Sequence, residues 1–574
     1  MVSGRLHKMR KLTSILLGLI LSFGATAIGS AAVSSVGDPG RAWSVPNDGQ
    51  RGEHIQEFLD TFPGEAGSDL LPSSGVQRYN DQDPTCSSLA DAKCSSRYIR
   101  YQAIVPYCKD ATEVNCTVDM GVIDSTGKKI SASFNRYFPT KALNQFVGSP
   151  EFKLPSGVAG SLFSIPSAPH DGGDKYYLSV QMNGDGNQTT GINMTDFSVK
   201  LYPVALEVDP SIGSRSDTGW NDFAAGSEGN STGKTTWLRA GPGFSGNNFC
   251  VATSGAERLC AQRYAFPSDL KFYVVVRSLQ LPSGWLHGRL TSPDIKITKE
   301  STASIIEIQG EPVAVPVVYK MYKYPSMPAE LKAEYDVKTG AYRKDPNFAR
   351  NALDYAQGGR TSHSEDPLQR NVIVAPEASS SAGMEQLKLW LPFVEDKATA
   401  LLSYWSVRTL SSAEMEGSSS CFTDSRNVTG IVTTNSTQYS GGPPAFNAVK
   451  GTLNYQVAAP HFGTSGDVFR GSYDLVMRSD VARCVYGFTK APINATLSIT
   501  SNDGVPQVAT VVVGERNGWL YLQAKNFEFS SPVITAKLTQ KKNQKYSINC
   551  VKGSKTKKVT GTSPKCPSGY KKAA

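Results

Sequence analysis

The placement of ten cysteines restricts the possible folds of this chain more than any other feature of its sequence. They fall into four close groups and one distant pair: Cys86 with Cys94, Cys108 with Cys116, Cys250 with Cys260, Cys550 with Cys566, and then Cys421 and Cys484. An even number of locally grouped cysteines is typical of disulfide-bonded proteins from oxidising compartments. Metal binding is the alternative, but zinc ligands usually lie two to four residues apart and no cysteine pair has that spacing. We therefore expect five intramolecular disulfides, no free thiol and no metal site.

The first 32 residues have the pattern of a secretory signal peptide. Four basic residues precede an apolar run over residues 12–28, and residues 30–32 supply the small side chains that a signal peptidase requires. An uncleaved anchor is the alternative, because the run approaches the shortest length that spans a bilayer. Two glycines in the run and its small-residue end favour cleavage after Ala32. The pattern predicts a chain that is secreted or held at the cell surface, with no transmembrane segment after cleavage.

Charge is distributed unevenly along the chain. The net charge is +9, yet four basic residues lie in the first 32 and eleven lysines lie in residues 537–574, and neither segment contains an acid. Residues 33–536 therefore carry a net charge of −6. A mildly acidic body followed by a strongly basic tail indicates that the tail contacts something anionic.

Length and composition predict a mainly β, multidomain protein. A chain of 574 residues exceeds one ordinary core. Its 52 glycines, 33 prolines and 24 tyrosines favour many short strands joined by turns. We expect antiparallel β-sandwich-like modules, a small helical insertion and a basic C-terminal tail. The expected divisions are a signal peptide, 1–32; a leader or linker, 33–80; a first β domain, 81–208; a linker, 209–234; a second β module, 235–322; a helical insertion or spacer, 323–383; a helix plus a third β module, 384–540; and the tail, 541–574.

Several local elements follow from residue patterns. Alternating apolar residues predict strands at 98–107, 175–182 and 197–204. The glycine- and asparagine-rich residues 183–187 predict a hairpin turn between the last two. Helices are expected at 347–355 and at 384–402, the second with a restart or a kink at Pro392.

Two Gly-Trp-Leu stretches suggest an internal repeat. One contains Trp285 and the other contains Trp519, and each is followed by a Ser-Pro dipeptide that opens an apolar segment. A cysteine and a proline precede each stretch in the same order but at different spacings. The stretches are either a divergent repeat or two unrelated hairpins. A repeat requires both tryptophans to be largely buried on the same face of their sheets.

Motifs with catalytic potential have simpler explanations. Residues 229–235 imitate a nucleophile elbow and a phosphate loop, but no apolar strand precedes them and the first phosphate-loop glycine is replaced by Glu228. His170 and His461 each follow Ala-Pro, and we interpret both as turn residues rather than metal ligands. The sequence identifies no catalytic residue and no cofactor.

The C-terminal tail is the most specific motif. Lysine-rich residues 550–561 lead to Pro564-Lys565-Cys566-Pro567 and then to Tyr570-Lys571-Lys572. This ending, together with residues 165–170 and 479–488, resembles parts of large exported surface proteins of actinobacteria that share a lysine-rich, Cys-bracketed C-terminal tail. The resemblance is patchy over the mature chain. It implies a surface location and no known activity, so it assigns no catalytic residue.

We therefore predict an exported, non-catalytic cell-surface binding or structural protein of a Gram-positive-type bacterium, whose tail associates with the anionic cell wall. The expected partners are an anionic wall polymer or surface glycan and other surface proteins, but not nucleic acid. The candidate anion-contacting residues are Lys541, Lys542, Lys545, Lys552, Lys555, Lys557, Lys558, Lys565, Lys571 and Lys572. A solvated extension that only aids solubility is the alternative for the tail. The alternative for the whole protein is an extracellular carbohydrate-active enzyme of glycoside hydrolase type, whose acid pair no local spacing identifies.

Overall fold

The computed structural model describes residues 34–38, 52–58, 60, 67–72, 85–95, 97–140, 144–208, 250–254, 257, 259–334, 366, 368, 372–374, 376–423, 427–489, 493–500, 506–507, 510–529, 532–540, 546–561 and 564–573. Strands make up 55% of the structure and helices 9%, which confirms the mainly β prediction. The expected signal peptide, the motif at 229–235 and the expected helix at 347–355 lie outside the described residues.

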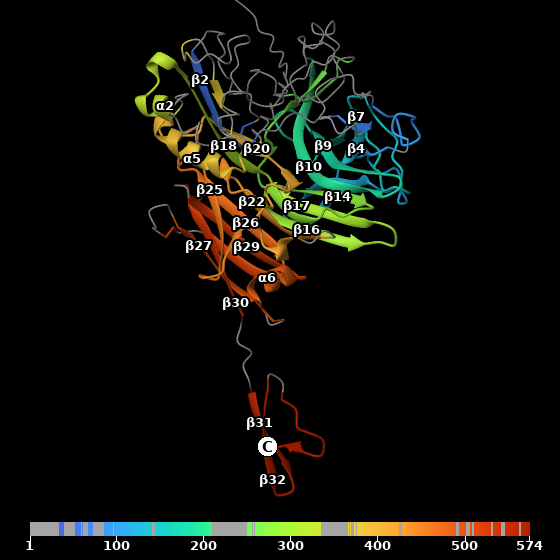
Figure 1. The fold of residues 1–574 in the computed structure, drawn as a ribbon, viewed down its shortest axis with the longest axis vertical. Helices are drawn as coiled ribbons and strands as arrows, with labels where there is room; N and C mark the ends of the chain where they lie inside the picture. The colour runs from blue at the N-terminus through green and yellow to red at the C-terminus, as the bar shows by residue number, and fades with distance from the viewer. Residues whose placement is uncertain are drawn as a thin grey trace, which may run out of the picture. The chain divides into compact units, whose positions relative to one another are not determined.

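A 14-stranded sheet dominates the fold (Figure 1). Its main path runs through β28 (Thr510–Arg516), β29 (Trp519–Glu528), β26 (Arg470–Arg478), β22 (Val428–Thr434), β15 (Gly284–Arg289), β21 (Ser406–Thr409), β10 (Gly191–Val208), β9 (Lys175–Asn187), β4 (Ile99–Ile104) and β3 (Asp69–Pro72). Two strand pairs extend it: β12 (Leu259–Arg263) with β11 (Cys250–Ser254) beside β10, and β8 (Gly160–Ser164) with β7 (Ser133–Phe138) beside β9. Its pairings are antiparallel except for the parallel contact between β15 and β22.

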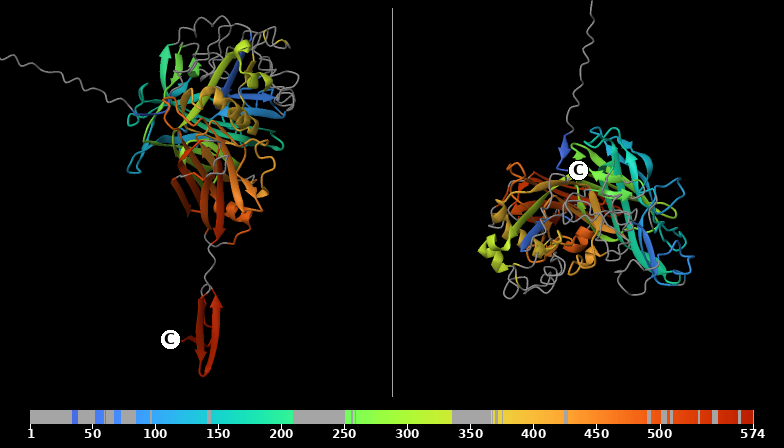
Figure 2. Two further views of the ribbon diagram at one scale, coloured as in Figure 1. Left: turned by 90° about the vertical axis from the view of Figure 1, so that its left-hand side faces the viewer. Right: turned by 90° about the horizontal axis from the view of Figure 1, so that it is seen from above.

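Five smaller sheets complete the structure. One five-stranded sheet runs β16 (Thr291–Lys299), β17 (Ser304–Glu311), β14 (Lys271–Ser278), β5 (Cys116–Ile123) and β6 (Lys129–Ser131). The other runs β23 (Gln438–Tyr439), β25 (Thr452–Ala458), β30 (Val533–Gln540) and β27 (Ile493–Thr500), with β24 (Ala445–Asn447) beside β25. A four-stranded sheet holds β19 (Val372–Val374), β2 (Glu53–Phe58), β18 (Val313–Lys323) and β20 (Ala400–Tyr404), and β1 (Ser35–Val36) pairs with β13 (Phe266–Pro267). A three-stranded C-terminal sheet of β32 (Lys555–Gly561), β31 (Tyr546–Lys552) and β33 (Lys571–Lys572) is drawn in red in Figure 2.

The described helices are few and short. The α-helices are α2 (Ala329–Glu334), α5 (Ser381–Trp390) and α6 (Ser479–Tyr486), and the 3₁₀ helices are η2 (Tyr324–Ser326), η4 (Leu391–Val394) and η5 (Ser420–Phe422). No helix among the described residues combines the length and the apolar character that crossing a membrane requires.

The large sheet is covered differently on its two faces, because side chains alternate along each strand. On one face, Val199 of β10 and Val476 of β26 join a core that also contains Val274 of β14 and Ile308 of β17. On the other face, Leu475 of β26 packs in a second core with strands β25, β27 and β30. The large sheet therefore lies between two five-stranded sheets.

The face that carries Leu475 changes character along the sheet. One row of directly opposed residues crosses β29, β26 and β22 as Leu522, Leu475 and Val432, all buried and apolar. The same row continues through β15, β21, β10 and β9 as His287, Arg408, Ser198 and Gln181. The five-stranded sheet that contains β25, β27 and β30 covers the apolar part of this row. The polar part forms the floor of the pocket described below.

Of the two interpretations of the Gly-Trp-Leu stretches, the divergent repeat is wrong. Trp285 lies over Gly430 on the adjacent strand. Gly430 is opposite Met477, and Met477 is opposite Leu520. These residues face the second core, whereas Trp519, the neighbour of Leu520, packs against the first. The two tryptophans therefore lie on opposite faces of one sheet. The shared tripeptide does not fix the register, and one residue of difference reverses a side chain.

The hairpin turn expected at residues 183–187 is also misplaced. Strand β9 continues to Asn187, and the connection is residues 188–190. The Asn187 carboxamide oxygen accepts hydrogen bonds from the backbone N–H groups of Thr189 and Thr190 at 2.8 and 2.7 Å, which closes the turn. A Cβ at Gly184 would lie 2.0 Å from the carbonyl oxygen of Asn193, so this glycine permits close strand contact instead of a turn.

The helix expected over residues 384–402 is shorter than predicted. Helix α5 ends at Trp390 and η4 follows as a 3₁₀ helix that contains Pro392. Strand β20 already begins at Ala400. Proline cannot donate the helical hydrogen bond, so the regular helix ends just before it and a 3₁₀ helix starts there.

The modules expected at 81–208, 235–322 and 384–540 share hydrogen-bonded sheets. Strands from all three regions lie side by side in the large sheet, where β10 pairs with β21 and β21 with β15. The neighbouring five-stranded sheet likewise pairs β5 with β14.

Four of the five expected disulfides are present: Cys86–Cys94, Cys108–Cys116, Cys421–Cys484 and Cys550–Cys566. Cys260 is also disulfide-bonded, whereas the side chain of Cys250 lies outside the described residues. No described cysteine is free. The bond Cys421–Cys484 joins η5 to α6 across 63 residues. These bonds indicate an oxidising environment.

Candidate functional site

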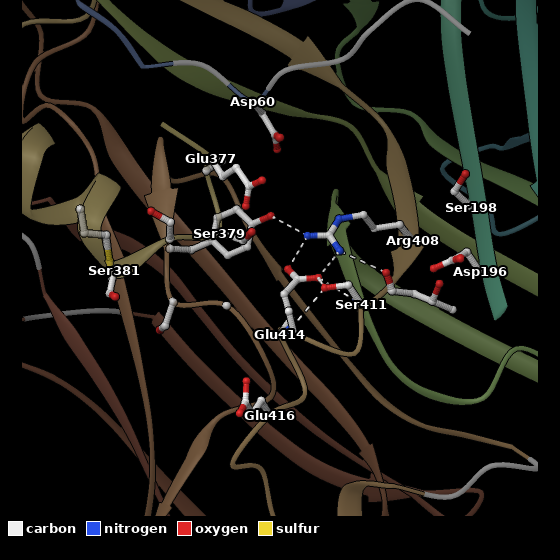
Figure 3. A pocket seen from close by; sticks show the side chains of 18 of the residues that line it. Asp60, Asp196, Ser198, Glu377, Ser379, Ser381, Arg408, Ser411, Glu414 and Glu416 are labelled. Carbon is white, nitrogen blue, oxygen red and sulfur yellow. Dashed lines mark hydrogen bonds and ion pairs between the residues drawn. The ribbon is translucent and has the colours of Figure 1, made fainter. Parts of the chain in front are cut away.

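A polar pocket of about 880 Å³ lies on the polar part of the large sheet (Figure 3). Its floor is the row Gln181, Ser198 and Arg408 on the adjacent strands β9, β10 and β21. Opposed residues on neighbouring strands are about 5 Å apart, so these three side chains form a continuous polar strip. The other lining residues include Asp60, Asn183, Asp196, Lys200, Glu377, Ser379, Ser380, Ser381, Ser411, Glu414, Glu416, Tyr439, Ser440 and Gln456.

An ion pair occupies the centre of the polar pocket. The Arg408 guanidinium contacts both carboxylate oxygens of Glu414 at 2.7 Å, in a bidentate arrangement. The backbone N–H of Ser411 also donates to Glu414, at 2.9 Å. Burial alone would raise the pKa of Glu414, but the hydrogen bonds and charge of Arg408 outweigh it and lower the pKa below its usual value. Glu414 is therefore a carboxylate at neutral pH.

The rings of Tyr439 and His287 lie next to this ion pair and stack on each other. Arg408 donates from Nη2 to the hydroxyl of Tyr439 at 3.3 Å. The Tyr439 ring stacks on the imidazole of His287, with ring centroids 4.0 Å apart and planes 2° apart. Burial, together with the charges of Arg289 and Arg408, lowers the pKa of His287 well below its usual value. His287 is therefore a neutral, structural ring.

A second ion pair, between Arg289 and the lining residue Asp60, lies beside the polar pocket. Nε of the buried Arg289 lies 2.6 Å from a carboxylate oxygen of Asp60. The Arg289 guanidinium also donates to the carbonyl oxygens of Thr434 and Ser436 at 3.0 and 2.7 Å. Its charge lies 4.7 Å from the centre of the Tyr439 ring, within the range of a cation–π contact.

The pocket is suited to hydrogen bonding more than to proton transfer. The charge of Arg408 in the pocket and that of Arg289 beside it are each compensated by a carboxylate, and burial raises the pKa of Tyr439 to about 12. Glu414, His287 and Tyr439 therefore do not exchange protons near neutral pH. Within the part of the chain that the structure describes, no three acidic, histidine or cysteine side chains are grouped as a metal ion would require.

The sequence did not point to the polar pocket. Its residues come from Asp60, strands β9 and β10, the loop before α5, and strands β21 and β23, which are far apart in the chain. Arg408 lies in a short strand that also contains Ser406 and Thr409, so no local pattern marks it as functional. His170 and His461, by contrast, are turn residues as interpreted: they contact the carbonyl oxygens of Lys175 and Phe529 at 2.8 and 2.9 Å.

The C-terminal sheet carries the residues that the sequence did single out. Strands β31 and β32 form a hairpin in which Lys552 and Lys555 are opposite each other, so its loop is Gly553 and Ser554. Gly553 has a φ of +58°, which two-residue hairpin loops require and which glycine adopts without strain. The bond Cys550–Cys566 ties the hairpin to the segment that leads into β33.

All described candidate lysines of the tail are exposed. They are Lys552, Lys555, Lys557, Lys558, Lys565, Lys571 and Lys572. Lys541, Lys542 and Lys545 lie outside the described residues. The structure thus gathers six candidate cations on one small sheet and a seventh, Lys565, on the segment between its strands, and no acid occurs after Glu528 in the sequence.

Neither the family models, nor the curated proteins, nor the solved structures that were compared with this chain gave a match.

Proposed function

We propose that this chain is an exported surface protein of a Gram-positive-type bacterium and that its C-terminal sheet holds it to an anionic polymer of the cell wall. The observation that carries this proposal is the C-terminal sheet with its disulfide-linked segment: seven exposed lysines, no acidic side chain, and a disulfide that keeps the strands together. Like charges at this density repel one another, and an external polyanion removes that repulsion.

The body of the protein is a poor alternative partner for the tail. Residues 33–536 carry a net charge of only −6, spread over five hundred residues. The larger charge density of a wall polymer attracts exposed ammonium groups more strongly, and salt screens that attraction. The β sheets of the body then serve binding or structural roles at the surface, and the polar pocket is a candidate site on them.

The test is retention on isolated wall between about 0.1 and 1 M salt, where the Debye length falls from ~10 to ~3 Å. The intact mature chain is expected to elute as salt rises, and deletion of residues 541–574 to abolish retention at low salt. Replacing Cys550 and Cys566 with serine keeps every lysine and is expected to weaken retention less. Retention that changes neither with salt nor with the deletion would show that the body, and not the tail, binds the wall.

An extracellular carbohydrate-active enzyme is the second candidate, and the carboxylates of the polar pocket are what favours it. Asp60 and Glu414 are engaged with arginines, so an acid pair would come from the other acidic lining residues, Asp196, Glu377 and Glu416. Release of soluble sugar from wall glycan, lost on Glu377→Gln and Glu416→Gln, would support this function. Equal release by the double variant and the unmodified chain would argue against it.

A further inference from the structure

We propose that one face of the C-terminal sheet is the binding surface and that its ligand is a linear phosphodiester polymer. This lysine face consists of Lys552, Lys555, Lys557 and Lys572. The inference rests on the proposed function, which it refines from a basic tail to four lysines in a fixed arrangement.

Strand register defines the lysine face. Residues that are directly opposite in an antiparallel pair have their side chains on the same face. Lys552 is opposite Lys555, and Cys550 lies between Lys557 on β32 and Lys572 on β33. Because residues two apart on a strand share a face, all four lysines project to the side from which the Cys550–Cys566 bond leaves the sheet.

The opposite face has a different composition. It carries Ser547 and Thr560, whose hydroxyl oxygens are 2.8 Å apart, and also Asn549 and Thr556. Its lysines are Lys558 and Lys571. This face is therefore mainly neutral and polar, and it provides a control with the same hairpin and the same disulfide.

The spacing on the lysine face suits a polymer with regularly repeated charges. Lys555 and Lys557 are two residues apart on one strand, which places their backbones about 6.6 Å apart. Lys557 and Lys572 are separated by two strand spacings, about 10 Å. Lys552 and Lys555 are directly opposed like charges, an arrangement that destabilises a hairpin unless an anion lies between them.

The lysine side chains are free to contact a ligand. All four are exposed, whereas Cys550 on the same face is completely buried. A Cβ on Gly569 would lie 3.0 Å from Nζ of Lys552, so the loop after the disulfide runs next to this ammonium group. The disulfide therefore fixes the third strand, and with it Lys572, beside the hairpin lysines.

The type of cation favours a repeated, diffuse array of anions over a single precisely shaped anion pocket. The last arginine in the chain is Arg516, so all eleven cations from residue 537 onward are lysines. Arginine has a planar fork that makes directional, bidentate contacts with carboxylate and phosphate alike, whereas lysine acts as a point charge with three rotatable donors. A phosphodiester presents two equivalent charged oxygens that an ammonium group can approach from many directions.

The experiment measures binding of the full mature chain to poly(glycerol phosphate) over a salt series. Each phosphate contact on a flexible polyanion contributes roughly −0.7 to the slope of log affinity against log salt. Four contacts predict a slope of about −3, and the seven described lysines acting together predict about −5. The double variant Lys555→Gln with Lys557→Gln removes two charges from the lysine face, and Lys558→Gln with Lys571→Gln removes two from the opposite face.

We expect the lysine-face variant to lose affinity by about 25-fold, on the basis of roughly fivefold for each lysine at an anionic surface, and to halve the salt slope. The opposite-face variant is expected to bind as the unmodified chain does. A charge-retaining variant, Lys555→Arg with Lys557→Arg, is expected to keep the affinity, which excludes misfolding as the cause.

Three results would overturn the inference. Equal losses in the two glutamine variants would show that the tail acts as a diffuse charge, which refutes the lysine face but leaves the proposed function intact. Equal affinity for polygalacturonate would refute the phosphodiester assignment. An unmodified chain that binds neither polymer nor isolated wall would refute the proposed function itself.

Discussion

Replacement of Trp285 with alanine tests the packing of the large sheet at its centre. The Trp285 side chain is 1% exposed, and its ring meets Phe422 edge-on at 4.9 Å. It also lies over Gly430 of the adjacent strand, where an added Cβ would be 2.6 Å from the indole ring. Since Gly430 has no positive φ, alanine is excluded at that position by the ring and not by the backbone.

These contacts predict the unfolding free-energy losses of two single variants and the coupling energy between them. Trp285→Ala is expected to lower the free energy of unfolding by ~3–5 kcal/mol, the usual loss for a buried aromatic residue. Gly430→Ala alone is expected to cost ~1–3 kcal/mol by overpacking. In the Trp285→Ala background the new methyl group enters the vacated space, so its cost should fall to about zero and the coupling energy should be ~1–3 kcal/mol.

The assay is equilibrium urea unfolding followed by circular dichroism, with the four proteins of the cycle compared at unchanged m value. Trp519→Ala is a matched control, because Trp519 is only half-buried and starts a strand on the opposite face. It is expected to cost less than Trp285→Ala. Strictly additive losses for Trp285→Ala and Gly430→Ala would refute the contact between them.

Three further predictions concern the pocket and the disulfides. Burial lowers the pKa of His287, so below about pH 6.5 only the unfolded state binds its proton. The free energy of unfolding should therefore fall by ~1.4 kcal/mol for each pH unit of acidification. His287→Phe should flatten this pH dependence, and an unchanged slope of the free energy against pH would contradict the prediction. Glu414→Gln should cost ~1–3 kcal/mol in urea unfolding, less than for a fully buried pair because Arg408 is 37% exposed, and a neutral effect would refute a stabilising ion pair. Replacing Cys421 and Cys484 with serine should cost about 4 kcal/mol, the loop-closure value for 63 residues, as measured by the same unfolding assay; a loss below ~1 kcal/mol would refute it.

The sequence predicted features that depend on local chemistry. Cys86 pairs with Cys94 and Cys108 with Cys116 as expected, because close cysteines in an oxidising environment find one another first, and strands at 175–182 and 197–204 follow from alternation. Features that depend on register were not predictable. The glycines at 184 and 186 looked like turn residues, yet Gly184 lies inside β9 because a neighbouring backbone leaves no room for a Cβ.

The polar pocket shows the same limit more strongly. Arg408 and Glu414 are close in sequence, but their role depends on His287 and Tyr439, which arrive from strands β15 and β23. No residue of this set is unusual in its own segment. The pocket exists because one row of the large sheet changes from apolar to polar between Val432 and His287, and that change is visible only once the strands are in order.

In the tail, the sequence predicted the charges and the structure adds their arrangement. A slip of one residue between β31 and β32 would move Lys555 and Lys557 to the face of Ser547, because side chains alternate with a period of two. Two features oppose that slip: the two-residue loop at Gly553, and the disulfide at Cys550, which lies opposite Lys557. A simple solubilising extension has no need of a fixed register. The glycine, the disulfide and the lysine spacing together therefore favour a surface shaped for a repeating anion.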